Sequence, residues 1–259
     1  MLKFLENEPK YLTSVLTIKD TKVVKEEDLE EERRRGKPEE IIQQEYYCSF
    51  AGAIFGSYYA DMLSKAKYGN YPYDARYLVH TMWDLGVSDY TAIWFVQWID
   101  GIPRLIDYYE NSGYGYGHYA AVVLGKGYNY GIHALPHDGN NRIPTEQEIA
   151  LSPKTQLQNL GLNNIEIIER TKNVINDINT VRGILPLCEF NDKTKLGYEA
   201  LKQYHKDFDE NRKIFKDTPD HDWSSHGADA FRILPFLEKK IITPVKSFNK
   251  PKLWNGKFY

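Results

Sequence analysis

Three apolar runs joined by short turns constrain the fold of this chain more than any other feature. The first follows Arg76 (YLVHTMWDL), the second begins at Tyr90 (YTAIWFVQWI), and the third follows Asp100-Gly101 (IPRLIDYYE). Their β-branched and aromatic side chains favour strands, and connections this short join antiparallel neighbours. The segment therefore predicts a three-stranded antiparallel meander.

The segment after the meander predicts a helical crossover and a return to the same sheet. A helix over 119–127 is followed by a further strand, NYGIHALPHD. Because a helix intervenes, this strand can lie parallel to the first one. A helix capped by Ser152 and a short strand over 164–169 come next, and helices are predicted over 174–183, 196–208 and 224–240. We predict an α/β fold with a mixed sheet of five or more strands flanked by helices.

Composition and motif searches exclude several classes. The 259 residues are 42% hydrophobic, which is enough for a substantial core, and no apolar run is long enough to cross a membrane. Cys48 and Cys188 form no CxxC pair, which argues against a disulfide framework or a structural zinc site. Neither a Walker A loop nor a GxSxG elbow occurs. We expect a soluble, unexported protein that does not hydrolyse ATP by that route.

Residues 25–40 form the most highly charged stretch of the chain. They hold eight acidic and five basic residues, with the acidic ones leading and Arg33 to Arg35 closing the run. This order suits the helix dipole, so we predict a solvent-exposed helix that ends at Gly36 and Pro38.

Three aspartates stand at positions where separate elements could bring them together. Asp84 ends the first strand, Asp138 follows the returning strand, and Asp229 lies between two alanines in a helix. Parallel neighbouring strands lie about 4.8 Å apart, so two carboxylates at the same end can share a divalent cation. A turn-forming role is the alternative for Asp84 and Asp138. Asp229 lies within a helix, where a turn role fails.

Two other motifs are weaker. Gly115 to Ala120 matches a dinucleotide-binding GxGxxA pattern, but a hairpin precedes it where that motif requires a parallel βαβ unit. His133 and His137 lie on one strand face, yet zinc would prefer a fuller set of histidines or cysteines. A tyrosine-rich loop and hydrogen-bonded histidines are the preferred interpretations.

A few further residues could support a metal site or contact a nucleic acid. His221, Asp222 and His226 could act as second-shell groups around the acids. The net charge of −3 removes the strongly basic signature of proteins that bind nucleic acid by charge alone. Phosphate contacts would then come from local cations, and the candidates are Arg142, Lys154, Arg232 and the lysine-rich tail.

Several segments resemble the nuclease domain of the large terminase subunit of tailed bacteriophages. They include WDLGVSDYTAIWFVQW, LIDYYENSG, YGIHALPHD, LPLCEF and PDHDWSSHGADAFR, and together they span nearly the whole chain. The resemblance implies residues 1–70 as a segment connecting to a packaging ATPase, 71–240 as an RNase H-like nuclease domain, and 241–259 as a basic tail. The ATPase itself is absent from this chain, which implies an excised domain or a truncated or split protein.

The resemblance also implies a function and a site. It implies a two-metal endonuclease that uses Mg²⁺ or Mn²⁺ to cut concatemeric double-stranded viral DNA during packaging in the host cytoplasm. The portal protein, the small terminase subunit and the packaging ATPase are the implied partners. Asp84, Asp138 and Asp229 correspond to the catalytic, metal-binding acids, and Asp89 matches a further acid of the family.

Two alternatives remain open on the sequence. One is a non-catalytic packaging or assembly module that docks on the portal or ATPase while its acids are vestigial. The other is an RNase H-type or junction-resolving nuclease, which would share the acidic site but prefer RNA/DNA hybrids or four-way junctions.

Overall fold

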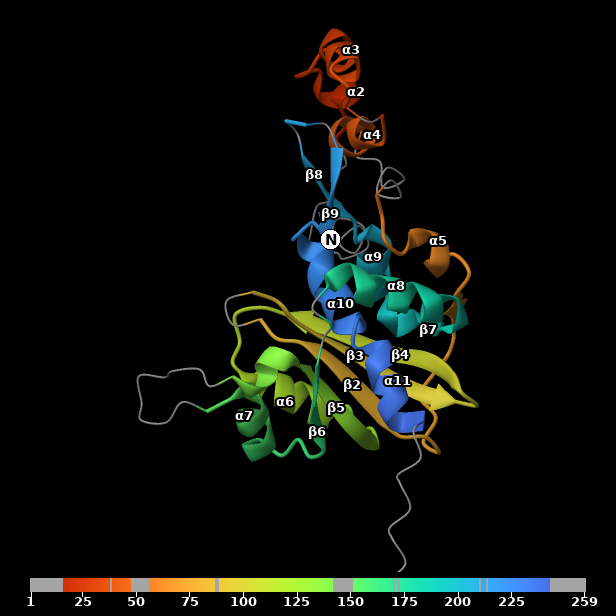
Figure 1. Cartoon of the computed structure of the whole chain (residues 1–259), viewed down its shortest axis with the longest axis vertical. Helices are drawn as coiled ribbons and strands as arrows, with labels where there is room; N and C mark the ends of the chain where they lie inside the picture. The colour runs from red at the N-terminus through yellow and green to blue at the C-terminus, as the bar shows by residue number, and fades with distance from the viewer. Residues whose placement is uncertain are drawn as a thin grey trace, which may run out of the picture.

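A seven-stranded mixed sheet forms the centre of the molecule (Figure 1). The computed structural model describes residues 16–37, 39–47, 56–86, 89–141, 151–169, 171, 173–209, 211–212 and 214–242. The strand order is β1-β7-β4-β3-β2-β5-β6. The strands are β1 (Lys67–Gly69), β2 (Val79–Asp84), β3 (Thr91–Ile99), β4 (Ile102–Asn111), β5 (Tyr130–Pro136), β6 (Ile165–Ile168) and β7 (Glu189–Asn191). The predicted α/β fold is confirmed.

The predicted meander and its parallel return are both present. β2 pairs antiparallel with β3, and β3 pairs antiparallel with β4. Asp100 and Gly101 form the second turn with positive φ angles of 53° and 80°, the left-handed conformation that a two-residue hairpin turn requires. β5 then pairs parallel with β2, with Met82 opposite Ala134. As a result, β2, β4 and β5 all end at the same edge of the sheet.

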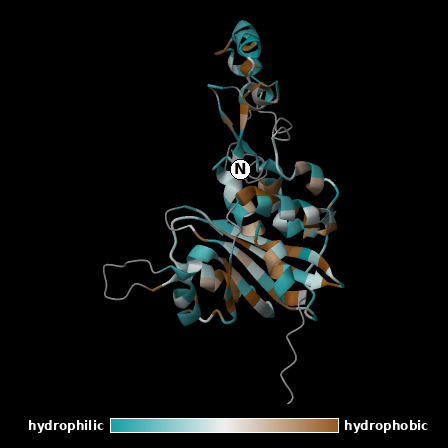
Figure 2. Cartoon of the chain, in the orientation of Figure 1, coloured by the Kyte–Doolittle hydropathy of each residue, from teal (hydrophilic) through white to brown (hydrophobic). Residues whose placement is uncertain are grey.

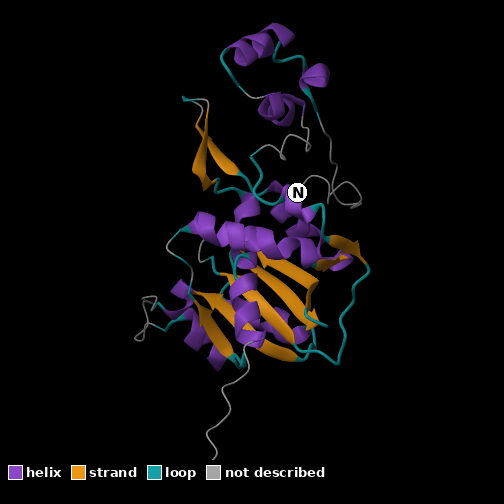
Figure 3. Ribbon diagram, turned by 45° about the vertical axis from the view of Figure 1, so that its right-hand side comes forward, coloured by secondary structure: helices purple, strands orange, loops and turns teal. Residues whose placement is uncertain are grey.

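Helices cover both faces of the sheet (Figure 3). One face carries α6 (Tyr116–Gly125) and α7 (Pro153–Asn159), whose Val123 and Leu157 pack with Trp83 of β2. The other face carries α5, α8, α9, α10 and α11, whose side chains pack around Trp94 of β3. Their bounds are α5 (Ala60–Leu63), α8 (Val174–Ile184), α9 (Lys195–Gln203), α10 (Trp223–Phe231) and α11 (Leu234–Ile242). The two cores pack against opposite faces of the sheet and fix the position of the edge where β2 and β5 end.

Two smaller units extend from one end of the molecule (Figure 1). The helices α2 (Ile18–Thr21), α3 (Glu26–Arg34) and α4 (Glu39–Tyr47) form one, and the β8 (Lys206–Asp209) and β9 (Ile214–Pro219) hairpin forms the other. The charged helix predicted over residues 25–40 is therefore present as α3, and Gly36 follows it with a φ of 89°. Its surface is largely hydrophilic (Figure 2).

The helix predicted over 224–240 is divided into α10 and α11. Pro235 causes the break, because it has no N–H for the Phe231 carbonyl and its ring clashes with that carbonyl. The helix predicted over 196–208 ends at Gln203, and residues 206–209 form β8. The first difference is a break within a predicted helix, and the second is an earlier helix end.

The structured body begins before residue 71, where the sequence suggested the connecting segment would end. Tyr59 and Leu63 are buried in the core around Trp94, and β1 joins the sheet through β7. The strands β1, β7, β8 and β9 were not predicted. No helix in the described part of the chain is long and apolar enough to cross a membrane.

Candidate active site at the acidic sheet edge

Asp84 and Asp138 lie at one edge of the sheet. Asp84 is the last residue of β2, and Asp138 lies in the 3₁₀ turn η2 (His137–Asn140) that follows β5. Since β2 and β5 are parallel hydrogen-bonded neighbours, their carboxyl ends meet at this edge, about 4.8 Å apart. The strand pairing required by the two-aspartate prediction is therefore present.

The helix α10 lies close to this edge because a glycine faces the sheet. A Cβ added to Gly227 would lie 2.8 Å from the Tyr108 hydroxyl and 3.1 Å from the Ala200 Cβ. The Trp94 indole N–H donates to the Gly227 carbonyl at 2.8 Å. Asp222 caps the helix by accepting a 2.9 Å hydrogen bond from the Ser224 backbone N–H. These contacts fix the distance of α10 from the sheet and the residue at which the helix begins.

His226 of α10 reaches the end of β2. Its Nδ1 lies 3.7 Å from Asp84 Oδ2, and its Nε2 lies 3.2 Å from Asp89 Oδ1. The contact with Asp84 raises the pKa of His226, burial opposes this, and the negative charges of Asp89 and Glu110 add to it. The Tyr90 ring stacks on the imidazole with a centroid separation of 5.6 Å. His226, which the sequence suggested as a second-shell group, thus contacts Asp84 itself.

Glu110 is a fourth acid at this edge that we did not predict. Asp84 pairs with Ala92, and Ala92 pairs with Glu110, so both acids project from the same sheet face across a small side chain. The Tyr108 hydroxyl donates to Glu110 at 2.5 Å. Burial raises the pKa of Glu110, although the Tyr108 hydrogen bond opposes the shift. Its position near the end of the third apolar run, like that of Asp84 at the end of the first, was a usable sequence signal.

Asp229 meets an arginine in this structure. Arg232 Nη2 lies 2.9 Å from Asp229 Oδ1, and the Tyr204 hydroxyl lies 3.5 Å from the same oxygen. Arg232 is only 5% exposed. The arginine proposed from the sequence for DNA contact is therefore a buried partner of Asp229, away from the solvent-exposed surface that a phosphate would reach.

The other predicted residues occupy varied positions. His221 is exposed, and its Nε2 lies 3.5 Å from Asp89 Oδ2, while Asp222 serves as the cap of α10. Lys154 lies in the first turn of α7, which packs against the η2 turn that holds Asp138. Arg142 and the lysine tail after residue 242 lie outside the described residues.

The donor types at the acidic edge fit a hard divalent cation. Carboxylate oxygens suit Mg²⁺ and Mn²⁺. In the ranges that the structure describes, no three His, Cys, Asp or Glu side chains are gathered as a metal-binding group. His226 instead joins Asp84 and Asp89 through direct contacts.

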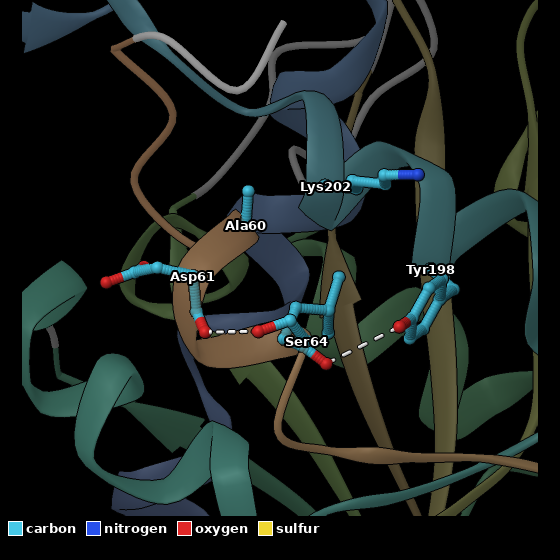
Figure 4. A pocket seen from close by; sticks show the side chains of 6 residues that line it. Ala60, Asp61, Ser64, Tyr198 and Lys202 are labelled. Carbon is cyan, nitrogen blue, oxygen red and sulfur yellow. Dashed lines mark hydrogen bonds between the residues drawn. The ribbon is translucent and has the colours of Figure 1, made fainter. Parts of the chain in front are cut away.

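A separate pocket of about 420 Å³ lies between α5 and α9 (Figure 4). Ala60, Leu63, Tyr198 and Lys202 are among the residues that line it, and none of the acids at the sheet edge does. The pocket therefore does not form part of the acidic edge.

Known structures share this architecture, although no protein-family model and no curated protein matches the sequence. The large terminase of the thermophilic bacteriophage D6E matches with a TM-score of 0.52 and 16% identity, covering 92% of this chain and 58% of that protein. The nuclease domain of the P22 large terminase matches with a TM-score of 0.52 and 17% identity, covering 70% of this chain and 91% of that domain. This chain thus spans less than two thirds of the D6E protein and most of the P22 domain. Its fold is the RNase H-like fold of large terminase nuclease domains, as the sequence resemblance implied.

Proposed function

We propose that this chain is a divalent-metal-dependent DNA endonuclease whose active site is the acidic sheet edge. The supporting observation is that the parallel neighbours β2 and β5 end at one sheet edge, Asp84 as the last residue of β2 and Asp138 in the turn after β5, with His226 of α10 in contact with Asp84. The shared fold with a terminase nuclease domain favours the same chemistry. The acids alone would repel a phosphate backbone, so bound cations should strengthen DNA binding at this site.

We propose Asp84, Asp138 and His226 as the residues that would hold Mg²⁺ or Mn²⁺, with two ions as the family resemblance implies. Such ions supply activation of water and neutralisation of the leaving oxygen. Asp89 would orient His226 from its other ring nitrogen, as the 3.2 Å contact indicates. Glu110 stands across Ala92 from Asp84 and would add a further carboxylate.

We assign Asp229 a structural role in place of the ligand role suggested by sequence. Its carboxylate neutralises Arg232, whose guanidinium is buried beneath α10. Without a nearby anion, a buried guanidinium would cost several kcal/mol. In this assignment Asp229 fixes α10, and His226 acts at the site.

The biological setting that we propose is genome packaging by a tailed bacteriophage. The substrate would be concatemeric double-stranded DNA in the host cytoplasm. This nuclease would act with a packaging ATPase, the portal protein and the small terminase subunit. The supporting comparison is the D6E protein of similar fold, which is a large terminase with a longer chain than this one. Lys154, beside the Asp138 turn, is the described cation best placed to meet a phosphate.

Cleavage of supercoiled plasmid in Mn²⁺, Mg²⁺ and EDTA tests the proposal. The wild-type chain should nick and linearise the plasmid only with metal, and Asp138→Ala should abolish this. Asp217→Ala is a matched control, because its side chain is 93% exposed on the β8–β9 hairpin. Equal cutting by Asp138→Ala would reject the site. Absence of metal-dependent cutting by the wild type would favour a non-catalytic assembly module.

Preference among substrates separates the remaining nuclease classes. A packaging nuclease should cut linear or supercoiled duplex without requiring a special structure. Faster cutting of RNA/DNA hybrids or of four-way junctions under the same conditions would instead indicate an RNase H-type or junction-resolving enzyme.

A further inference from the structure

The loop between β4 and α6 lies at the same edge as the acids. Asn111 is the last residue of β4 and pairs with Thr91 of β3. This pair is next to the cross-strand row formed by Asp84, Ala92 and Glu110. At the other end of the loop, Tyr116 begins α6, on the sheet face opposite to α10. The loop residues 112–115 therefore leave the sheet at the edge that holds Asp84 and lead to the face that carries α6.

Four aromatic side chains form a cluster around this loop, which we call the aromatic platform: Tyr109, Tyr114, His118 and Tyr119. The Tyr114 ring lies on the His118 ring with a centroid separation of 4.1 Å and an interplanar angle of 17°. His118 Nε2 shares a 2.6 Å hydrogen bond with the Tyr109 hydroxyl, and the ring packs edge-on against Tyr119. Tyr114 nevertheless remains 52% exposed. A fixed aromatic face is thus presented to solvent.

The backbone around the platform is open to a ligand. The positions of Gly113, Gly115 and Gly117 have no neighbouring atom within 4 Å of where a Cβ would lie. Space is therefore open on the Cβ side of the glycines that flank Tyr114. An extended strand could approach the loop while it contacts the ring.

We infer that the aromatic platform binds an unpaired base of the DNA strand at the active-site edge, with the base stacked on Tyr114. This inference rests on the proposed nuclease function for the identity of the ligand. A base offers a flat face of the kind that exposed, supported aromatic rings bind. Stacking also supplies affinity without positive charge, which suits a chain of net charge −3 whose site is acidic.

Fluorescence anisotropy in EDTA tests the inference with two duplexes of equal length, one fully paired and one with an unpaired bulge. Tyr114→Ala should weaken binding of the bulged duplex about 10-fold and that of the paired duplex less than about 2-fold. Tyr114→Phe keeps the aromatic face and should bind like the wild type. Tyr68→Ala is the matched control, since Tyr68 is a 41% exposed tyrosine on β1, which pairs through β7 with the first residues of β4, away from the loop that follows Asn111.

Salt dependence gives a second test of the same variant. The loss caused by Tyr114→Ala should be equal at about 50 mM and about 200 mM salt, because stacking releases no counterions. Equal losses on both duplexes, a defect in Tyr114→Phe, or a loss that disappears at high salt would overturn the inference. Because binding is measured without metal, a failure of cleavage would count against the proposed function while leaving this binding result intact.

Discussion

Replacing Asp229 with Asn and His226 with Ala separates the two roles that we assign to α10. Asp229 is paired with Arg232 at 2.9 Å, whereas His226 contacts Asp84 and Asp89 at the sheet edge. Asp229→Asn should therefore lower stability and retain cleavage. His226→Ala should retain the fold and lose cleavage.

The expected size of each effect follows from burial and contacts. Removing one partner of a buried ion pair costs about 3–5 kcal/mol. The Asp229 side chain is 26% exposed and Asn keeps an acceptor for Arg232, so we expect about 2 kcal/mol. For a chain of this size that corresponds to a melting temperature lower by about 4–8 °C. Loss of His226 should reduce cleavage at least about 100-fold, since even outer partners of metal ligands cost about 10–100-fold.

The assay combines thermal melting with plasmid nicking well below the lower melting temperature. Nicking then reports on the site and melting on the ion pair. Loss of cleavage in Asp229→Asn with unchanged melting would refute the structural role, and wild-type nicking by His226→Ala would refute the assignment of His226. Combining Asp229→Asn with Arg232→Met should restore part of the lost stability, because no buried charge is then left unpaired.

Two further predictions concern packing and pH. Gly227→Ala should lower the free energy of unfolding by about 1–3 kcal/mol and reduce nicking, because the added Cβ would lie 2.8 Å from the Tyr108 hydroxyl. Gly183→Ala on α8 is the control. It has open space around it and should leave nicking and melting nearly unchanged. Burial lowers the pKa of His80 and of His133 to about 4, so the stability present above pH 6.5 should fall as pH drops toward 4. The loss at pH 5 should reach about 2 kcal/mol per histidine, and equal urea midpoints at pH 7.5 and pH 5 would contradict it.

The neutral state of these histidines follows from their hydrogen bonds. The Trp83 indole donates to Thr81 Oγ1 at 2.7 Å, and the Thr81 hydroxyl shares a 2.7 Å hydrogen bond with His133 Nδ1, in which it donates when the ring carries its proton on Nε2. His80 Nδ1 accepts from the Ile132 backbone N–H at 3.0 Å. Each ring nitrogen that acts as an acceptor would lose this role on protonation, so the sign of the pH effect is fixed by the contacts.

The sequence predicts the centre of the sheet well because its signals are local. Short turns and alternating apolar residues define the meander, and a helix before β5 permits its parallel return. Strands β1 and β7 have three residues each, too few to show a period, and they exist through parallel pairing with each other. The division at Pro235 was readable from sequence, since proline interrupts a helix.

The site was predicted less completely because helix orientation is a tertiary property. Asp229 lies between two alanines, which suggested a carboxylate turned to the sheet. The structure brings Gly227 against Tyr108 and pairs Asp229 with Arg232. Three positions separate His226 from Asp229, so a small rotation of the helix decides between them. Sequence spacing alone does not specify that rotation.

Charge pairing distinguishes the acidic edge from the rest of the sheet. Two buried acids elsewhere on the sheet meet permanent cations: Glu189 lies 2.8 Å from Arg104, and Asp107 lies 2.6 Å from Lys126. At the edge, Asp84 and Asp89 share His226, whose charge depends on protonation. A carboxylate held by arginine is costly to release, whereas one held by histidine can exchange that partner for a cation. The same fold therefore uses fixed ion pairs for its stability and an exchangeable one where we place its chemistry.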